Sequence, residues 1–424
     1  MSASWCIKNG RIIDPANDID RIADLLVLDG RIAGPGQPIP PGVPEIDARG
    51  LWAVPGLIDM HVHLREPGEE YKEDILSGAR AAAAGGFTGV ACMPNTRPIN
   101  DCATVTATIK ARASAAAVRV YPVGAISLGC EGKQLAEYGE MREAGIVAVS
   151  DDGRPVRDSQ LMRRALEYAS DFGLPVISHS EEAALSTGVM HEGPAATRLG
   201  LKGIPAAAEA IMVYRELALA ELTGARVHIA HVSTAMAVEL IRAAKGRGVR
   251  VTAETAPHYF TLTDEAVLGY DTNTKMNPPL RSAADREAIR RALADGAIDA
   301  IATDHAPHSI LEKEVEFDRA ANGIIGLETA LPLTLALVRE HVIDERRLVE
   351  LLAVRPAAIL GLAHGSLSPG APADIALIDP RQQFVYTADQ IVSKSRNTPF
   401  LDWALQGRAV LTMVDGSIRH NLLF

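Results

Sequence analysis

The segment GLIDMHVH, residues 56–63, is the first of eight short apolar runs in the middle of the chain. These runs alternate with stretches rich in Ala, Leu, Arg and Glu, a composition that favours helix. Repeated strand–helix units predict parallel strands, and eight of them predict an α/β fold built on a closed (β/α)8 TIM-like barrel. The alternative, an open doubly wound sheet, needs a glycine-rich phosphate turn after its first strand, and the sequence has none there.

The predicted elements can be placed along the chain at a spacing of roughly 25–50 residues per strand. We predict strands over residues 56–63, 88–95, 118–127, 146–150, 175–179, 226–234, 249–257 and 298–307. We predict helices over residues 72–84, 158–171, 206–222, 236–246 and 283–294. The barrel is therefore expected to occupy residues 54–364.

Both ends of the chain are expected to be β-rich. Residues 5–14 and 23–32 alternate apolar and polar side chains beside Asn-Gly and Asp-Gly pairs, a hairpin pattern. Residues 373–379 and 409–418 read as further short strands joined by a turn. The simplest arrangement is a small β-sandwich module made from residues 1–53 and 365–424, beside the barrel.

Composition restricts the class of protein. A chain of 424 residues with 47% hydrophobic and 22% charged residues is typical of a globular protein, which excludes disordered, collagen-like and coiled-coil classes. The net charge of −11 argues against nucleic acid or a membrane as the main partner. The four cysteines show no paired spacing, so we expect free thiols in a cytoplasmic protein.

Metal-ligating side chains fall at the ends of the predicted strands, which is the catalytic face of such a barrel. His61 and His63 are two residues apart on a strand, so both can reach one metal ion. Imidazole with carboxylate suits zinc best, although cobalt or manganese can substitute. Two cations there would activate water and polarise a carbonyl. The further candidates are Asp151 or Asp152, His179, His231 and Asp304.

Four motifs resemble those of bacterial type I dihydroorotases, which belong to the amidohydrolase superfamily. They are DMHVHLREPG (59–68), MPNT (93–96), KMNPPLR (275–281) and ATDHAPH (302–308), the last followed by Lys313. The resemblance covers nearly the whole chain. It implies two zinc ions per subunit and the reversible cyclisation of N-carbamoyl-L-aspartate to L-dihydroorotate, the third step of de novo pyrimidine synthesis.

The resemblance also implies roles for individual residues. His61, His63 and Asp304 would hold one metal, His179 and His231 the other, with Asp152 shared; the spacing alone does not choose between Asp151 and Asp152. Asp304 would be the catalytic general acid and base. The implied substrate-binding residues are His63, Arg65, Asn95, Asn277, His308, Asn322 and Gly323.

One difference from other cyclic amidases, which agrees with the type I pattern, one departure from that pattern, and three other histidines matter for this interpretation. Related cyclic amidases bridge their metals with a carboxylated lysine on strand 4, and residues 146–153 contain none. Asn322 stands where many relatives have Phe, which would make that wall of the site more polar, beneath a predicted loop over residues 309–324. We expect His228 to be a packed core residue and His305 to point away, and His258 is a candidate for supporting the site from behind the ligands.

Two other functions stay open at this point. One is another cyclic amidase, such as a hydantoinase or an allantoinase. The other is a non-catalytic partner subunit of aspartate transcarbamoylase, although that class has lost metal ligands that this chain keeps. By resemblance alone, we expect a homodimer and an association with aspartate transcarbamoylase.

Overall fold

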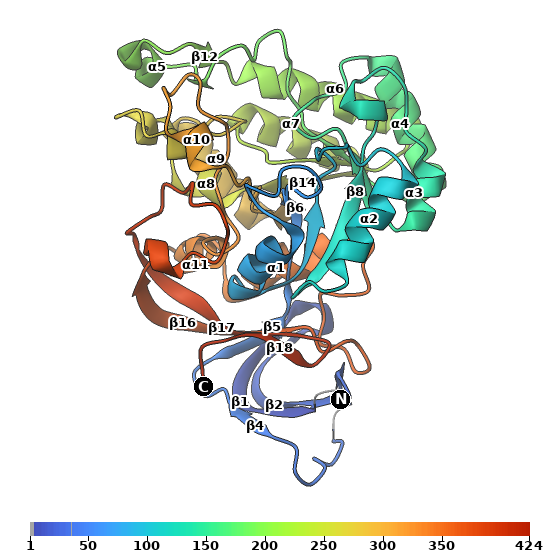
Figure 1. The fold of residues 1–424 in the computed structure, drawn as a ribbon, viewed down its shortest axis with the longest axis vertical. Helices are drawn as coiled ribbons and strands as arrows, with labels where there is room; N and C mark the ends of the chain where they lie inside the picture. The colour runs from blue at the N-terminus through green and yellow to red at the C-terminus, as the bar shows by residue number, and fades with distance from the viewer. Residues whose placement is uncertain (1–3, 35) are drawn as a thin grey trace.

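The computed structural model describes residues 4–34 and 36–424; residues 1–3 of the expected terminal module and residue 35 lie outside this range. The chain forms an α/β barrel with a β-sheet below it, and both ends of the chain belong to the sheet (Figure 1). In the described part of the chain, none of the helices has the length and apolar character needed to span a bilayer.

Eight parallel strands form the barrel, which confirms the predicted fold. They are hydrogen-bonded in chain order, and each overlaps its predicted segment. The circle closes through a parallel bridge from Val62 to His305, where His63 N donates to His305 O at 2.8 Å. The strands are β6 (Leu57–Val62), β7 (Phe87–Cys92), β8 (Arg119–Gly124), β9 (Ala148–Ser150), β10 (Val176–Ser178), β13 (Val227–Ile229), β14 (Val251–Thr255) and β15 (Ala300–Ile301).

The helices surround this barrel, and the five predicted ones correspond to α1, α4, α6, α7 and α9. Their starts follow from capping side chains: Asp74 accepts from Ser77 N at 2.8 Å to begin α1, and Ser282 accepts from Asp285 N at 3.2 Å to begin α9. The helices are α1 (Ile75–Ala84), α2 (Ala103–Ala113), α3 (Tyr138–Ala144), α4 (Ser159–Asp171), α5 (Pro194–Leu199), α6 (Ala207–Thr223), α7 (Ala235–Gly246), α8 (Pro257–Thr261), α9 (Ala283–Asp295), α10 (Ile310–Lys313), α11 (Ala330–Arg339), α12 (Glu345–Val349) and α13 (Arg355–Leu360).

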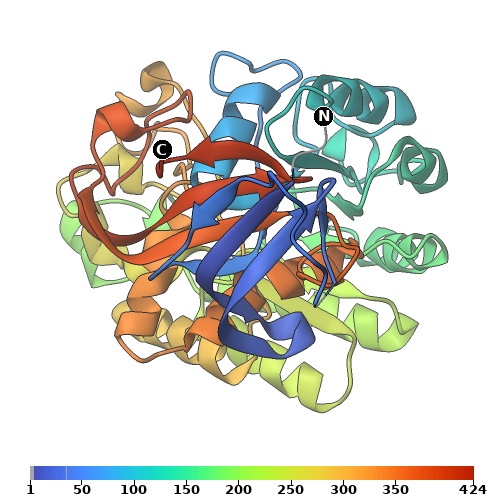
Figure 2. The same cartoon turned by 90° about the horizontal axis from the view of Figure 1, so that it is seen from below.

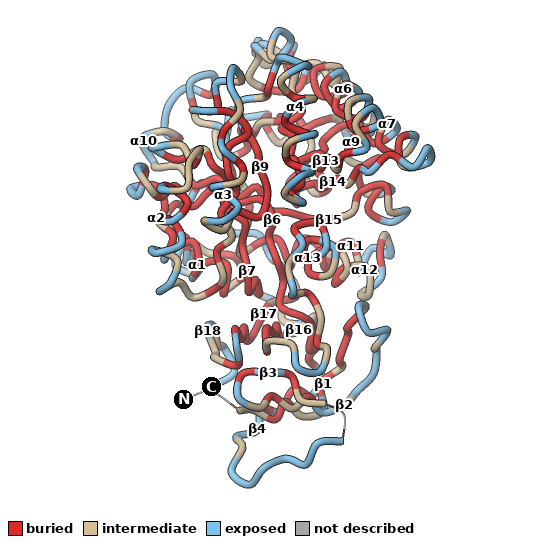
Figure 3. The backbone as a smooth tube through the Cα atoms, turned by 90° about the vertical axis from the view of Figure 1, so that its right-hand side faces the viewer, coloured by how far each residue is buried: buried red, intermediate tan, exposed pale blue. Residues whose placement is uncertain are grey.

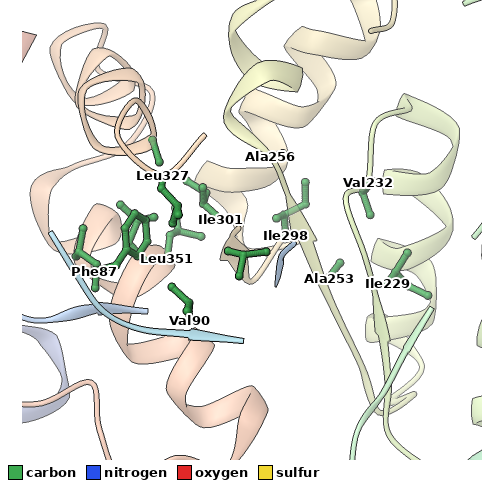
Figure 4. Close-up of a cluster of buried hydrophobic side chains, with 14 of the residues drawn as sticks. Phe87, Val90, Ile229, Val232, Ala253, Ala256, Ile298, Ile301, Leu327 and Leu351 are labelled. Atoms are coloured by element: carbon green, nitrogen blue, oxygen red, sulfur yellow. The ribbon is translucent and has the colours of Figure 1, made fainter. Parts of the chain in front are cut away.

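Apolar side chains fill both faces of the barrel wall. The strands are buried along their length, and exposed segments gather in the outer turns and loops (Figure 3). One large cluster lies between strands and helices and includes Phe87, Ile301 and Leu351 (Figure 4). A second cluster joins several strands through small side chains such as Ala91 and Ala300, which suits the low aromatic content of the sequence. This packing fixes the strand ends on which the polar residues stand.

The two termini build a single mixed sheet with its own apolar core. Its order is β18-β17-β16-β5-β1-β2-β3, with β4 paired to β1, so the two layers of the expected sandwich belong to one continuous sheet. The N-terminal strands lie across the C-terminal ones when seen from below (Figure 2). The strands are β1 (Trp5–Asp14), β2 (Ile19–Leu28), β3 (Arg31–Ile32), β4 (Glu45–Asp47), β5 (Trp52–Pro55), β16 (Ile375–Val385), β17 (Ala404–Val414) and β18 (Ser417–Asn421). A separate pair, β11 (Met190–His191) and β12 (Gly203–Ile204), lies beside α5 in the chain.

Candidate active site

Four histidines and two aspartates converge at the carboxyl ends of the barrel strands. All six are buried, and the structure brings together every residue predicted as a metal ligand. Two groups have their ligand atoms within 4.8 Å of one another, one of His61, Asp152 and His231 and the other of His61, His63 and Asp304. The six residues are His61, His63, Asp152, His179, His231 and Asp304, at or just after the ends of β6, β9, β10, β13 and β15.

The two histidines at the end of β6 are oriented by partners behind them. His61 Nδ1 lies 2.8 Å from Glu254 Oε1, and His63 Nδ1 lies 3.0 Å from Asn95 Oδ1. Because both partner atoms can only accept, we assign the proton to Nδ1 in each ring. In the neutral form of each ring, the Nε2 lone pair is then directed to the side where Asp152 and Asp304 lie, as metal ligation requires.

Asp152 is the carboxylate at the centre of the cluster. Its Oδ1 lies 3.3 Å from His61 Nε2, 3.7 Å from His179 Nδ1 and 3.6 Å from His231 Nε2. Its Oδ2 lies 3.5 Å from His63 Nε2. One carboxylate therefore faces imidazoles from three strands.

The neighbouring Asp151 faces the other way. Its carboxylate accepts the backbone N–H groups of Ile126 at 2.8 Å and Ser127 at 3.0 Å, and it also bonds the Ser127 hydroxyl. It therefore holds the loop after β8, as the capping interpretation predicted. The tertiary structure supplies the distinction between Asp151 and Asp152 that spacing could not make.

A buried nitrogen tests whether this donor set suits a cation. His61 Nε2 lies 3.3 Å from Asp152 Oδ1 and 3.7 Å from Asp304 Oδ1, yet it makes no hydrogen bond within residues 4–34 and 36–424. A buried imidazole lone pair aimed at two carboxylates has no favourable partner except a proton or a positive ion. The imidazole and carboxylate donors together fit zinc or a similar divalent ion.

The titration of these groups reflects their mutual contacts. Burial would raise the pKa of Asp152, but the charge of His61 and the nearby imidazoles of His179 and His231 outweigh it and hold that pKa well below its usual range. Burial would lower the pKa of His179, yet the facing carboxylate of Asp152 and the hydrogen bond to Glu181 raise it to about 10. Binding of a cation must displace protons from such imidazoles, so metal affinity will rise with pH.

Three residues of the site have a left-handed backbone conformation. The φ angles are +61° for Arg65, +36° for His231 and +48° for Asp304. Such conformations cost non-glycine residues about 1–3 kcal/mol each, and they cluster at functional sites where the fold enforces them. All three residues follow the last residue of their strands, so the simple alternation of a strand does not govern where their side chains point.

Arg65 and His308 form a wall beside the metal-ligand cluster. Arg65 Nε donates to Pro307 O at 3.1 Å, and Arg65 Nη2 lies 3.2 Å from His308 Nε2. His308 Nε2 also lies 2.8 Å from the carbonyl of Asn322, which can only accept, so we assign the ring proton to Nε2. The Arg65 Nη2 group thus meets a ring edge that cannot accept its proton, and it can donate to an anion.

The charge state of this wall suits an anion as well. Burial and the neighbouring Arg65 lower the pKa of His308 to about 3, so this ring is neutral near pH 7. Burial also lowers the pKa of Arg65, although the guanidinium stays charged. A carboxylate placed here would meet the buried positive charge of Arg65 and a neutral imidazole of His308.

The other predicted substrate contacts have varied surroundings. Asn95 Nδ2 donates to Asp152 Oδ2 at 3.2 Å and Asn277 Nδ2 donates to Glu181 Oε2 at 3.3 Å, so both amides border the cluster. The side chain of Asn322 is exposed, and its carbonyl is what contacts His308. Gly323 N donates to Lys275 O and its carbonyl accepts from Lys313 Nζ, so both backbone groups are already engaged.

Sequence reasoning missed the carboxylates that support the ligands. Glu254 bonds His61 Nδ1 and lies 3.3 Å from His228 Nε2, while Glu181 Oε2 lies 3.3 Å from His179 Nε2. His228 was predicted to pack in the core, and it is buried. It also lies against Glu254, in line with the need of a buried imidazole for polar partners. The available signal for Glu254 was an acidic residue inside the predicted barrel strand, within the segment VTAET of β14.

Two further histidines lie close to the ligands without facing them. His305 Nδ1 accepts from Gly326 N at 3.1 Å and its Nε2 lies 3.5 Å from Glu73, so it points away from the cluster as predicted. His258, at the start of α8, is buried against Tyr259, and burial lowers its pKa to about 4. A supporting role for His258 stays a prediction.

Comparison with known proteins agrees with this geometry. A family model described as dihydro-orotase-like matches residues 50–237. The chain is 60% identical over 419 residues to a dihydroorotase of Geotalea daltonii, covering 98% of this chain and 99% of that one. It is 57% identical over 427 residues to a dihydroorotase of Anaeromyxobacter dehalogenans, covering 99% of each.

Solved structures show the same fold. The L-hydantoinase (dihydropyrimidinase) of Arthrobacter aurescens has a TM-score of 0.89 at 26% identity, covering 100% of this chain and 98% of that one. A D-hydantoinase (dihydropyrimidinase) of Thermus sp. has a TM-score of 0.83 at 26% identity, covering 98% and 95%. Identity near 60% over almost the full length separates the dihydroorotases from these more distant relatives. The chain therefore belongs to the dihydroorotase family.

Proposed function

We propose that this protein is a metal-dependent dihydroorotase. It would cyclise N-carbamoyl-L-aspartate reversibly to L-dihydroorotate and water, the third step of pyrimidine biosynthesis. The observation that carries the proposal is the convergence of four buried histidines and two aspartates beside Arg65. This arrangement joins a site for cations to a site for the carboxylate of the substrate.

The proposed ligands divide into two sets around Asp152. His61, His63 and Asp304 would hold one cation, His179 and His231 would hold the other, and Asp152 would be shared. Bound zinc in such a site supplies Lewis acidity that activates water near neutral pH and polarises a carbonyl. Behind the ligands, Glu254, Asn95 and Glu181 keep His61, His63 and His179 in the tautomers that ligation needs.

Asp304 is the proposed general acid and base. Its Oδ1 lies 3.1 Å from His63 Nε2 and 3.7 Å from His61 Nε2, so it faces the same space as the proposed metal-ligand nitrogens. Burial would raise its pKa, but the charges of His61 and His63 outweigh burial and lower it. An ionised Asp304 can take a proton from the attacking water and deliver it to the amide nitrogen that leaves when the ring opens.

The substrate carboxylate is proposed to bind at Arg65, with His308 beside it. The Arg65 Nη2 group points at an imidazole edge that cannot accept its proton, so a carboxylate provides the missing acceptor. Asn95 and Asn277 would contact the ring, and Gly323 would line the same wall, where a side chain would collide with Ala306 and His308. Asn322 is proposed to line this wall through its backbone, since its side chain is exposed.

Substrate discrimination is the direct test. We would measure hydrolysis of L-dihydroorotate, dihydrouracil, hydantoin and allantoin by the purified chain under identical conditions. A site built to pair a carboxylate rejects analogues without one by about a thousandfold or more, so dihydroorotate should dominate. Preference for hydantoin or dihydrouracil would instead support the cyclic amidases that share the fold, and turnover of none of the four would support a non-catalytic subunit.

Metal analysis tests the ligand assignment separately. We expect two zinc ions per chain by mass spectrometry of the purified protein, and a clear loss in Asp152→Asn. Asp151→Asn is the matched control, because that carboxylate bonds Ser127 and faces away from the histidines. Equal metal content in both variants would contradict the bridging role of Asp152.

We also propose a homodimer and an association with aspartate transcarbamoylase, both implied by resemblance to the type I family. Light scattering of the chain alone and with that enzyme tests both. A monomeric mass at micromolar concentration would contradict the first, and unchanged masses on mixing would contradict the second.

A further inference from the structure

Residues 391–398, which we call the strap, run from the terminal sheet up the side of the barrel. They lie in the connection between β16 and β17, which Figure 1 shows rising from the sheet toward α10. Their side chains alternate between exposed and buried, the pattern of an extended chain lying flat on a surface. The buried face is polar, with Ser393, Ser395 and Asn397, so it needs specific hydrogen-bond partners on the barrel.

Groups of the barrel supply these partners along the first half of the strap. The Glu328 carboxylate accepts the N–H groups of Val392 at 3.0 Å and Ser393 at 3.1 Å. The Ser393 hydroxyl bonds the buried carboxylate of Glu73. Ser395 Oγ donates to Lys72 O at 2.7 Å. These bonds fix the path of the strap to the barrel mouth.

Asn397 is the point where the strap reaches the candidate active site. It is 3% exposed. Its Nδ2 donates to Ala306 O at 2.9 Å and to Gly323 O at 3.0 Å, while its Oδ1 accepts from His308 N at 2.9 Å. Its own carbonyl accepts from Ile325 N at 3.0 Å. One side chain thus joins two separate segments, residues 306–308 and residues 323–325.

These two segments make the wall that faces Arg65. Pro307 O accepts from Arg65 Nε, and the His308 ring lies against Arg65 Nη2. Gly323 packs so tightly here that an added Cβ would lie 2.5 Å from Ala306 O and 2.6 Å from His308 Cδ2. Any loosening between the segments would therefore move the imidazole and the guanidinium together.

We propose that Asn397 is a positioning residue for the carboxylate end of the substrate. It holds residues 306–308 and 323–325 in register, so that Arg65 and His308 present a fixed surface to the anion. This inference rests on the proposed function, in which that surface binds the carboxylate of dihydroorotate. It gives the C-terminal region a part in substrate binding although that region contributes no metal ligand.

Steady-state kinetics of Asn397→Ala on dihydroorotate is the test. A residue that positions the carboxylate surface acts on binding in the ground state and the transition state alike, so KM should rise about tenfold or more. We expect kcat to change less than about threefold, since the metal ligands are untouched. A folded variant with unchanged KM would overturn the proposal.

Thr398→Val is the matched control on the same strap. Thr398 is also buried, but its Oγ1 accepts from Phe400 N, just past the end of the strap, and no hydrogen bond of this side chain to the wall is found among the described residues. We expect a comparable loss of melting temperature with KM within about twofold of the parent. A KM rise equal to that of Asn397→Ala would show a general effect of strap stability and overturn the specific role.

Two further variants keep the result interpretable. If Asn397→Ala does not fold, Asn397→Asp keeps the shape and the acceptor for His308 N but cannot donate to the two carbonyls; it should raise KM, and a normal KM overturns the proposal. Arg65→Gln separates this inference from the proposed function. If Arg65→Gln leaves KM unchanged, the carboxylate assignment itself is wrong; if it raises KM and Asn397→Ala does not, the positioning role alone is wrong.

Discussion

The mouth of the barrel and the terminal sheet differ in the kind of side chain that they bury. The mouth buries imidazoles and carboxylates against one another, with left-handed backbone at Arg65, His231 and Asp304. The sheet encloses a core made of apolar side chains such as Leu377, Leu411 and Met413. Buried charge with strained backbone lowers stability, and apolar burial raises it. The comparison indicates that the chain concentrates its chemistry in one region and its stability in another.

The largest expected effect comes from the mouth. Asp304→Asn should lower kcat by about a hundred- to ten-thousandfold, because the amide cannot shuttle the proton. Metal should stay largely bound through the remaining histidines and Asp152. Turnover and metal content of the same preparation check this prediction. A variant with near-normal kcat would refute the acid–base role of Asp304.

The support behind the ligands should give the next largest effect. Glu254→Gln removes the negative charge that orients His61, and loss of such a partner typically lowers activity or metal affinity about 10- to 100-fold. Metal titration with a competing chelator measures the change. Asp14→Asn is the control from the terminal sheet, where a fully buried carboxylate accepts from Leu367 N at 2.8 Å. If both variants bind metal equally weakly, Glu254 has no special role in ligation.

The terminal sheet should respond in stability rather than in kinetics. Leu377→Ala in β16 removes a fully buried side chain of the sheet core and should cost about 2–5 kcal/mol of unfolding free energy. Denaturant unfolding measures this cost. We expect KM and kcat within about twofold of the parent at 25 °C. A KM rise like the one expected for Asn397→Ala would mean that the sheet transmits disorder through the strap.

The smallest expected effect is a pH dependence at the base of the strap. Burial raises the pKa of Glu328 to about 7, although it accepts the N–H groups of Val392 and Ser393. At pH values between the ordinary pKa of a carboxyl group and about 7, the folded chain therefore holds a proton on Glu328 that the unfolded chain has released. The contribution of Glu328 to stability is then largest at the acidic end of this window, falls as pH rises, and is constant above it.

Glu328→Gln removes this titration. The melting temperature of the variant relative to the parent should increase by about 1–3 °C between roughly pH 5 and pH 7.5, because the parent alone loses stability there. Paired melting curves across this range provide the measurement. A difference that stays constant, or one that decreases with pH, would contradict the raised pKa.

Much of the site could be predicted, because strand ends in a barrel meet at one face. The pair His61 and His63 and the carboxylates after the strands predict a metal centre from the sequence alone. The motif ATDHAPH (302–308) after β15 predicts, through family resemblance, that Asp304 is the general acid and base. What could not be predicted was side-chain direction beyond the strand ends, since His231 and Asp304 leave the extended conformation there. For the same reason, the spacing could not separate Asp151 from Asp152.

The sequence by itself determined the barrel, the terminal strands and the set of residue types at the mouth. Those features follow from local periodicity and from the order of elements along the chain. Only the tertiary structure decided that Glu254 supports His61 and that Asn397 reaches the wall beside Arg65. These contacts join residues far apart in the chain, such as His308 with Asn397, 89 positions apart, and His61 with Glu254, 193 positions apart. No local pattern encodes such pairs, because their proximity depends on how the packed strands and the strap bring distant segments together.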